Sequence, residues 1–135
     1  MKRALILSAS AGSGKTFRLV LKYICDIIMR PDRYRNILAV TFTNKATEEM
    51  KSRIINEIHR LASNAQSQYL EEIIRATQLS EPQIRERALK ARTKILHDYS
   101  RFSVLTIDKF FQRIIRAFIK ERCRVQADWV KECVE

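Results

Sequence analysis

The chain has 135 residues, of which 46% are hydrophobic and 30% are charged. This length and composition fit one globular domain or a piece of one, and they exclude a disordered chain and a protein of two full domains. Lys and Arg number 26 against 15 Asp and Glu, and the net charge of +11 favours a polyanionic partner such as nucleic acid, with solvated basic helix faces as the simpler alternative. Because only two Gly and two Pro are present, the composition argues against a β-sandwich or barrel with many turns.

The predicted elements begin with a short strand and a helix. Residues 4–7 form a wholly apolar run, which is typical of a strand buried on both faces. Residues 15–29 are apolar nearly all round and predict a buried helix, which Pro31 and Asp32 bring to an end. Residues 37–42 then predict a second buried strand.

The middle of the chain predicts three helices in succession. Thr43 or Asn44 caps an amphipathic helix over residues 44–61, and residues 68–77 form a second, short helix. The apolar positions of the first are Ala46, Met50, Ile54, Ile58 and Leu61. A third helix starts at Ser80-Glu81-Pro82. Its apolar side is expected to hold Ile84, Ala88, Ala91, Ile95 and Tyr99.

Residues 103–107 predict a third strand, and a helix begins at Asp108. Apolar residues of that helix fall in pairs four apart, at Phe110/Phe111, Ile114/Ile115 and Phe118/Ile119. Strands separated by helices imply parallel pairing with right-handed crossovers. The pattern therefore predicts an α/β fold.

The cysteines and the N-terminal residues bear on the compartment. Cys25, Cys123 and Cys133 are odd in number and form no CxxC pair, so they indicate neither a disulfide framework nor a zinc site. The apolar run at residues 4–7 is shorter than the roughly seven to fifteen residues of a signal peptide. No stretch is long enough to span a membrane. We expect a cytoplasmic protein without a membrane partner.

Residues 9–16 fit the spacing of a Walker A phosphate-binding loop, with Ala9 in place of the usual first Gly. Between a strand and a helix, backbone N–H groups can hold phosphate oxygens, aided by the helix dipole. Lys15 would reach the β- and γ-phosphates of ATP, and Thr16 would be a ligand of Mg²⁺. The predicted nucleotide-binding residues are Ala9, Ser10, Ala11, Gly12, Ser13, Gly14, Lys15 and Thr16, with Lys15 and Thr16 as catalytic residues. A small-residue turn that happens to precede a helix is the alternative.

Two further stretches, ILAVTFTNKATEEMKSRI at residues 37–54 and VLTIDKFFQRIIRAF at residues 104–118, follow this loop. They resemble motifs Ia and Ib of superfamily 1 DNA helicases of the UvrD/Rep type. The wording SASAGSGKT at residues 8–16 is most similar to the RecB/AddA branch of helicase-nucleases. The resemblance covers the chain up to about Arg124. It implies an ATP-dependent helicase or translocase of DNA repair or recombination that uses ATP and Mg²⁺.

The resemblance also implies a single-stranded DNA partner, which in the family contacts the strand ends of motifs Ia and Ib. The matching positions are Thr41, Phe42, Thr43, Asn44, Thr106 and Asp108. These stretches lie at the carboxyl ends of parallel strands, where such sheets bind ligands. Phe42 could stack on a base, and core packing explains it equally well. Lys45 could neutralise a phosphate, although most basic residues of the second half are expected to be ordinary solvated side chains.

Asp108 has two further interpretations. VLTID at residues 104–108 is similar to a Walker B strand, whose acid would hold the water of Mg²⁺. However, a helix begins directly after it, so N-capping accounts for Asp108 without chemistry. The resemblance to motif Ib supports the cap.

For the whole chain, the resemblance implies a partial RecA-like P-loop NTPase domain, a parallel sheet flanked by helices with a helical insertion before the third strand. We assign residues 1–124 to helicase domain 1A, with the helical segment at about 63–100, and residues 125–135 to a tail that starts a truncated region. The sequence contains neither the family's acidic metal motif nor its second RecA-like domain. We therefore expect a fragment of a longer helicase that binds ATP weakly and hydrolyses almost none, and a nuclease domain or partner of the parent protein is left open.

Two other functional classes remain open. A small P-loop nucleotide kinase would use Asp108 as a metal-site acid and Arg113 or Arg116 on its second substrate. A non-enzymatic nucleic-acid-binding module would bind DNA with a steep salt dependence and would ignore ATP.

Overall fold

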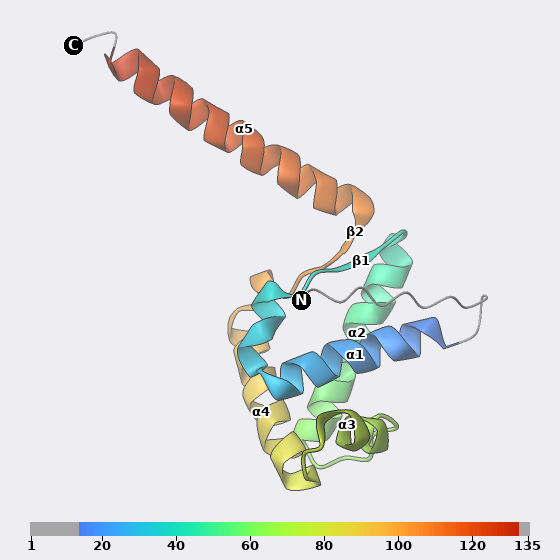
Figure 1. The fold of residues 1–135 in the computed structure, drawn as a ribbon. Coiled ribbons are helices and arrows are strands. Elements are labelled where there is room, and N and C mark those ends of the chain that lie inside the picture. Colours follow the sequence, from blue (N-terminus) through green and yellow to red (C-terminus); the bar gives the residue numbers. More distant parts are fainter. Residues whose placement is uncertain (1–13, 133–135) are drawn as a thin grey trace.

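The computed structural model describes the backbone of residues 14–132 and the side chains as far as residue 121. The predicted strand at residues 4–7 and the loop residues Ala9, Ser10, Ala11, Gly12 and Ser13 lie outside the described residues. The elements are, in order, α1 (Lys15–Met29), η1 (Pro31–Asn36), β1 (Ala39–Thr41), α2 (Asn44–Ala62), α3 (Leu70–Thr77), α4 (Glu81–His97), η2 (Tyr99–Arg101), β2 (Val104–Thr106) and α5 (Ile107–Glu132). Figure 1 shows α1 to α4 gathered below the two strands, while α5 projects away from them.

The strands β1 and β2 pair in parallel, with Thr41 opposite Thr106. The predicted parallel pairing is confirmed, but each described strand has only three residues, and the described chain is mostly helical. The predicted third strand is present as β2, and all of it is buried. The prediction of a buried strand at residues 37–42 was wrong, because Leu38 is 43% and Val40 is 40% exposed. The ladder ends at Thr41, although the apolar run extends beyond it.

The helix α1 begins and ends where the sequence predicts. Its contacts with α2, α3 and α4 bury one face, which carries Val20, Tyr23, Ile24, Cys25, Ile27 and Ile28. The prediction of a helix buried all round was wrong, because Leu19 is 51% and Met29 is 48% exposed. The apolar content of this helix therefore exceeds what its neighbours among the described residues cover.

The helix α2 packs most extensively against α4. Thr43 is its N-cap, as one of the two predicted candidates, and the Thr43 hydroxyl accepts a hydrogen bond from the Ala46 N–H at 3.1 Å. Its buried face consists of Thr47, Met50, Ile54, Glu57, Ile58 and Leu61. Ala46, which we predicted on this face, is exposed. The buried face of α2 therefore begins at Thr47, a polar residue that a search for apolar positions does not include.

The predicted start of α4 is confirmed. Ser80 forms a capping box with Gln83, and Pro82 lies in the first turn. Ile84, Ala88, Ala91 and Ile95 are buried as predicted. Tyr99 is not, because α4 ends at His97 and Tyr99 follows in η2, where it is 47% exposed.

Two arginines of α4 bind the carboxyl ends of other helices. The Arg87 guanidinium donates to the carbonyl oxygens of Ile28 at 3.3 Å and Met29 at 3.1 Å, at the end of α1. Arg85 donates to the carbonyl oxygen of Leu61 at 3.2 Å, at the end of α2. Both satisfy carbonyl groups that a helix end leaves without partners. The helical segment is therefore tied into the core.

The helix α5 starts at Ile107, one residue earlier than predicted. The Thr106 hydroxyl accepts a hydrogen bond from the Lys109 N–H at 3.3 Å, which is the geometry of an N-cap. Our prediction that Asp108 is the cap was therefore wrong, because Asp108 lies inside the first turn. The helix continues to Glu132, through the predicted boundary at residue 124, and that domain division stays a prediction. None of the helices in residues 14–132 has the length and apolar character that a membrane crossing needs.

Candidate nucleotide and DNA site

The start of α1 carries the described part of the phosphate loop. Gly14 is its N-cap, with φ 78° and ψ 17° in the left-handed region. A Cβ atom at Gly14 would meet no atom within 4 Å, so the backbone conformation rather than lack of space favours Gly here. The N–H of Arg18 donates to the Gly14 carbonyl oxygen at 3.0 Å, which closes the first turn.

Within the described residues 14–132, this helix start leaves backbone donors available. The N–H groups of Lys15, Thr16 and Phe17 precede the first intrahelical bond, and Gly14 has no side chain to accept from them. The first turn contains no acidic residue, and the side chains of Lys15 and Thr16 are exposed. An anion at this end would meet N–H donors, the positive end of the helix dipole and an ammonium group.

An aromatic contact fixes the same end of α1. The ring of Phe17 stacks on that of Tyr69, with centroids 4.3 Å apart and planes 15° from parallel. Tyr69 is only 1% exposed, and burial raises the pKa of its phenol. Its backbone N–H donates to the Ser67 hydroxyl at 3.1 Å, which donates to the buried Glu57 carboxylate at 2.8 Å. The helical segment therefore holds the first turn of α1 in place.

Three threonines organise the turn between β1 and α2. The Thr47 hydroxyl lies within hydrogen-bond distance of the Thr41 hydroxyl and donates to the Thr43 carbonyl oxygen at 3.0 Å. The Thr41 hydroxyl lies 3.2 Å from the same carbonyl oxygen, and its one proton can go either to that oxygen or to the Thr47 hydroxyl. Sequence reasoning missed Thr47, which is 2% exposed. Its place three residues before Met50, in register with Ile54, was the signal that could have found it.

Phe42 lies at the tip of this turn and is 87% exposed. The alternative that Phe42 packs in the core was therefore wrong. Thr43 and Asn44 are also exposed, as is Lys45. By contrast, Thr106 is 5% exposed, and its hydroxyl serves the start of α5. The turn therefore presents an aromatic ring, flanked by polar groups, to solvent.

The structure brings the strand-end candidates together but links them to the phosphate loop only indirectly. Thr41 and Thr106 are register neighbours, so the turn at Phe42 and the start of α5 lie at the same end of the sheet. Within residues 14–132, no hydrogen bond or ion pair joins Lys15 or Thr16 to these residues. The connection runs through the packing of α1 on α2.

The described residues contain no group of three His, Cys, Asp or Glu that could hold a metal ion. Asp108 is exposed in the first turn of α5 and belongs to no such group.

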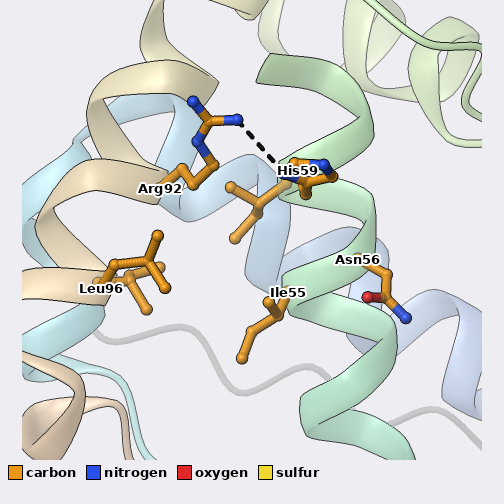
Figure 2. A pocket seen from close by; sticks show the side chains of 7 residues that line it. Ile55, Asn56, His59, Arg92 and Leu96 are labelled. Atoms are coloured by element: carbon orange, nitrogen blue, oxygen red, sulfur yellow. Dashed lines mark hydrogen bonds between the residues drawn. The ribbon is translucent and has the colours of Figure 1, made fainter. Parts of the chain in front are cut away.

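A shallow apolar pocket lies away from both regions, between α2 and α4. Figure 2 shows Ile55 and Leu96 along it and the hydrogen bond between Arg92 and His59 across it. The Arg92 guanidinium lies 3.3 Å from His59 Nδ1, and the volume is about 210 Å³. No residue of the predicted site lines this pocket.

Known proteins resemble the chain over most of its length. A family model for the UvrD/REP helicase N-terminal domain matches residues 1–132. An ATP-dependent helicase/nuclease of the AddA type from Lactobacillus acidophilus is 32% identical over 114 residues, which cover 84% of this chain and 8% of that protein. The RecB component of the RecBCD enzyme of Buchnera aphidicola is 33% identical over 127 residues, which cover 82% of this chain and 10% of that protein. No solved structure matches the chain significantly.

The chain therefore spans about a tenth or less of the length of these relatives. The match confirms the resemblance that the three sequence motifs indicated, and it favours the helicase interpretation over a nucleotide kinase. A RecA-like fold follows from this family, and the parallel pairing of β1 with β2 agrees with it. The chain belongs to the UvrD/REP helicase N-terminal domain family.

Proposed function

We propose that this chain is the ATP-binding part of a UvrD-type DNA helicase or translocase, with Mg-ATP at residues 9–16 and single-stranded DNA at the strand ends. The start of α1 is the observation that carries the proposal. A left-handed Gly14 heads a helix whose first N–H donors have no partner among residues 14–132, whose first turn has no acid, and whose Lys15 and Thr16 are exposed. Each of these features favours the binding of a phosphate chain.

The residues present fit a nucleotide with its metal ion. The Lys15 ammonium would neutralise charge on the β- and γ-phosphates, and the N–H groups at the head of α1 would orient the phosphate oxygens. The Thr16 hydroxyl would be a ligand of Mg²⁺, which supplies charge neutralisation when bound. The stacking of Phe17 on Tyr69 would keep these groups in place before the nucleotide arrives.

The turn after β1 would bind single-stranded DNA without reading its sequence. The exposed ring of Phe42 would stack on a base, since every base offers an aromatic face. Thr43 and Asn44 would hydrogen-bond to the backbone of the DNA. Thr106 would contribute through its backbone, because its side chain is only 5% exposed. Asp108, an anion, would accept from N–H groups of a base rather than approach a phosphate.

We further propose that the 135 residues alone bind ATP but turn over almost none. The family's acidic metal motif and its second RecA-like domain are not in this sequence. In the parent protein, residues 1–124 would form part of helicase domain 1A, and the following residues would lead into the next region. The family resemblance is our reason to propose DNA repair or recombination in the cytoplasm as the setting, and the name of the helicase/nuclease relative favours a nuclease domain or partner.

Thermal melting with Mg-ATP tests the nucleotide site. Mg-ATP should raise the melting temperature of the chain, and Lys15→Ala should abolish the shift. Lys22→Ala is the matched control, because Lys22 lies on the same helix, about two turns away from the proposed site, and pairs with Asp26 at 3.1 Å. A shift that survives in Lys15→Ala, or no shift in the unmodified chain, would contradict the proposed site. Rapid phosphate release with single-stranded DNA, lost in Lys15→Ala, would refute the proposed lack of turnover.

A further inference from the structure

Four cations form a single row along α5. Lys109, Arg113, Arg116 and Lys120, here named the α5 cation ridge, are all exposed. They follow one another at intervals of four, three and four residues. At about 100° per residue, their directions fall within roughly 60° of one another around the helix axis, over a length of about 16 Å.

The ridge differs from five positions on α1 to α4, where a base pairs with an acid four residues away. Such pairs are Lys22–Asp26, Arg53–Glu49, Arg75–Glu71, Arg85–Glu81 and Lys90–Glu86. On the ridge, the neighbours at these spacings are other cations, an arrangement that destabilises a helix. Among the described side chains of α5, the acids Asp108 and Glu121 lie on other faces, and no ion pair involves the ridge. A polyanion would relieve this repulsion.

The opposite side of α5 is apolar. Phe111, Ile115, Phe118 and Ile119 are exposed by 55%, 55%, 68% and 56%. Their directions centre roughly opposite the ridge. The helix projects from the rest of the molecule, and its main contacts with it are to β1 and β2 (Figure 1). Protein that covers the apolar stripe would therefore leave the ridge open to solvent.

The ridge begins at the strand ends. The N–H of Lys109 donates to the Thr106 hydroxyl, and Thr106 is the register neighbour of Thr41, which directly precedes the exposed Phe42. A stacking ring and a row of cations that start from the same end of the sheet are a combination that binds single-stranded DNA without sequence preference. Duplex DNA offers no free base face to such a ring.

We propose that the α5 cation ridge is a phosphate track that extends the path of single-stranded DNA beyond Phe42. The inference rests on the proposed DNA site and adds residues that the helicase motifs do not assign. The ring would hold a base at the strand ends, and the ridge would neutralise the phosphates that follow along α5.

Anisotropy titrations of a fluorescent oligo-dT with the 135-residue chain, at several salt concentrations, test the proposal. Arg113→Gln/Arg116→Gln should weaken binding about tenfold or more at low salt, and should reduce the salt slope by about 1.4, at ~0.7 per phosphate contact. The matched control Arg75→Gln/Lys90→Gln removes the same charge from α3 and α4, where both cations have acidic partners. It should keep the slope of the unmodified chain. Helicity by circular dichroism should be unchanged or higher in the ridge variant, because like-charge neighbours are removed.

Several outcomes would overturn the phosphate track. Two concern the variants: an unchanged salt slope in the ridge variant, and a loss of binding in the control equal to that in the ridge variant. Two concern the ligand: tighter binding of duplex DNA than of oligo-dT, and displacement of oligo-dT by polyglutamate as readily as by unlabelled oligo-dT. Phe42→Ala separates this inference from the proposed DNA site. Loss of binding in Phe42→Ala alone would refute the ridge and keep the site, whereas loss in the ridge variant alone would refute the role of Phe42.

Discussion

Replacing Phe42 with Ala tests the proposed DNA site, because we expect almost no change in the stability of the fold and a large loss of DNA binding. The ring is 87% exposed, so its removal takes almost no buried contact from the fold, and the free energy of unfolding should change by less than ~0.5 kcal/mol. Stacking of a base on an aromatic ring contributes about 1–3 kcal/mol. Phe42→Ala should therefore weaken oligo-dT binding roughly 5- to 150-fold while the protein stays as stable as before.

Fluorescence anisotropy with oligo-dT and urea unfolding measure the two quantities on the same preparations. Phe111→Ala is the matched control, because Phe111 is also exposed, at 55%, but lies on the apolar stripe of α5. It should leave both quantities unchanged. Phe102→Ala provides the contrast, since this ring is 4% exposed and should cost about 3–5 kcal/mol of stability. Unweakened binding in Phe42→Ala, or a stability loss close to that of Phe102→Ala, would refute the reasoning.

Three further predictions concern the fold. Thr47→Val removes a buried hydroxyl that donates to the Thr43 carbonyl oxygen at 3.0 Å, and it should lower the free energy of unfolding in urea by about 1–2 kcal/mol. The control Thr93→Val removes an exposed hydroxyl and should change this free energy by less than ~0.5 kcal/mol. Equal losses in the two variants would contradict the role of Thr47. Ser80→Ala breaks the capping box of α4 and should cost about 1 kcal/mol, so an unchanged midpoint would count against the box. Burial raises the pKa of Tyr23 above its usual value near 10, so folding favours the protonated phenol. The stability that the protonated phenol contributes is present below about pH 10 and falls as the pH rises toward the pKa of the folded state. Tyr23→Phe should lose less stability than the unmodified chain between about pH 9 and pH 11, and identical losses would refute the assignment.

Elements with local signals could be predicted from the sequence. The bounds of α1 and the N-caps at Thr43 and Ser80 depend on residues within one or two turns, so they were found. The parallel pairing of β1 and β2 followed from the alternation of strands and helices. The family could be predicted because each of its motifs is a short, contiguous stretch of characteristic residues.

Other features depend on neighbours that no local pattern reveals. The length of β1 is set by the ladder with β2, so an apolar run of six residues gave a strand of three. The exposure of Phe42 depends on the Thr41, Thr43 and Thr47 hydrogen bonds that turn the chain sharply after β1. Arg87 reaches the end of α1 across 58 residues of sequence, a contact that is purely tertiary.

Amide hydrogen exchange at the head of α1 tests the central claim most directly. Saturating Mg-ATP should slow exchange at Lys15, Thr16 and Phe17, whose N–H groups precede the first intrahelical bond and should bind phosphate oxygens. In Lys15→Ala, the same nucleotide concentration should leave Thr16 and Phe17 at their nucleotide-free rates. Unchanged exchange in the unmodified chain, or equal protection in Lys15→Ala, would contradict the claim that this helix start binds the phosphates of ATP.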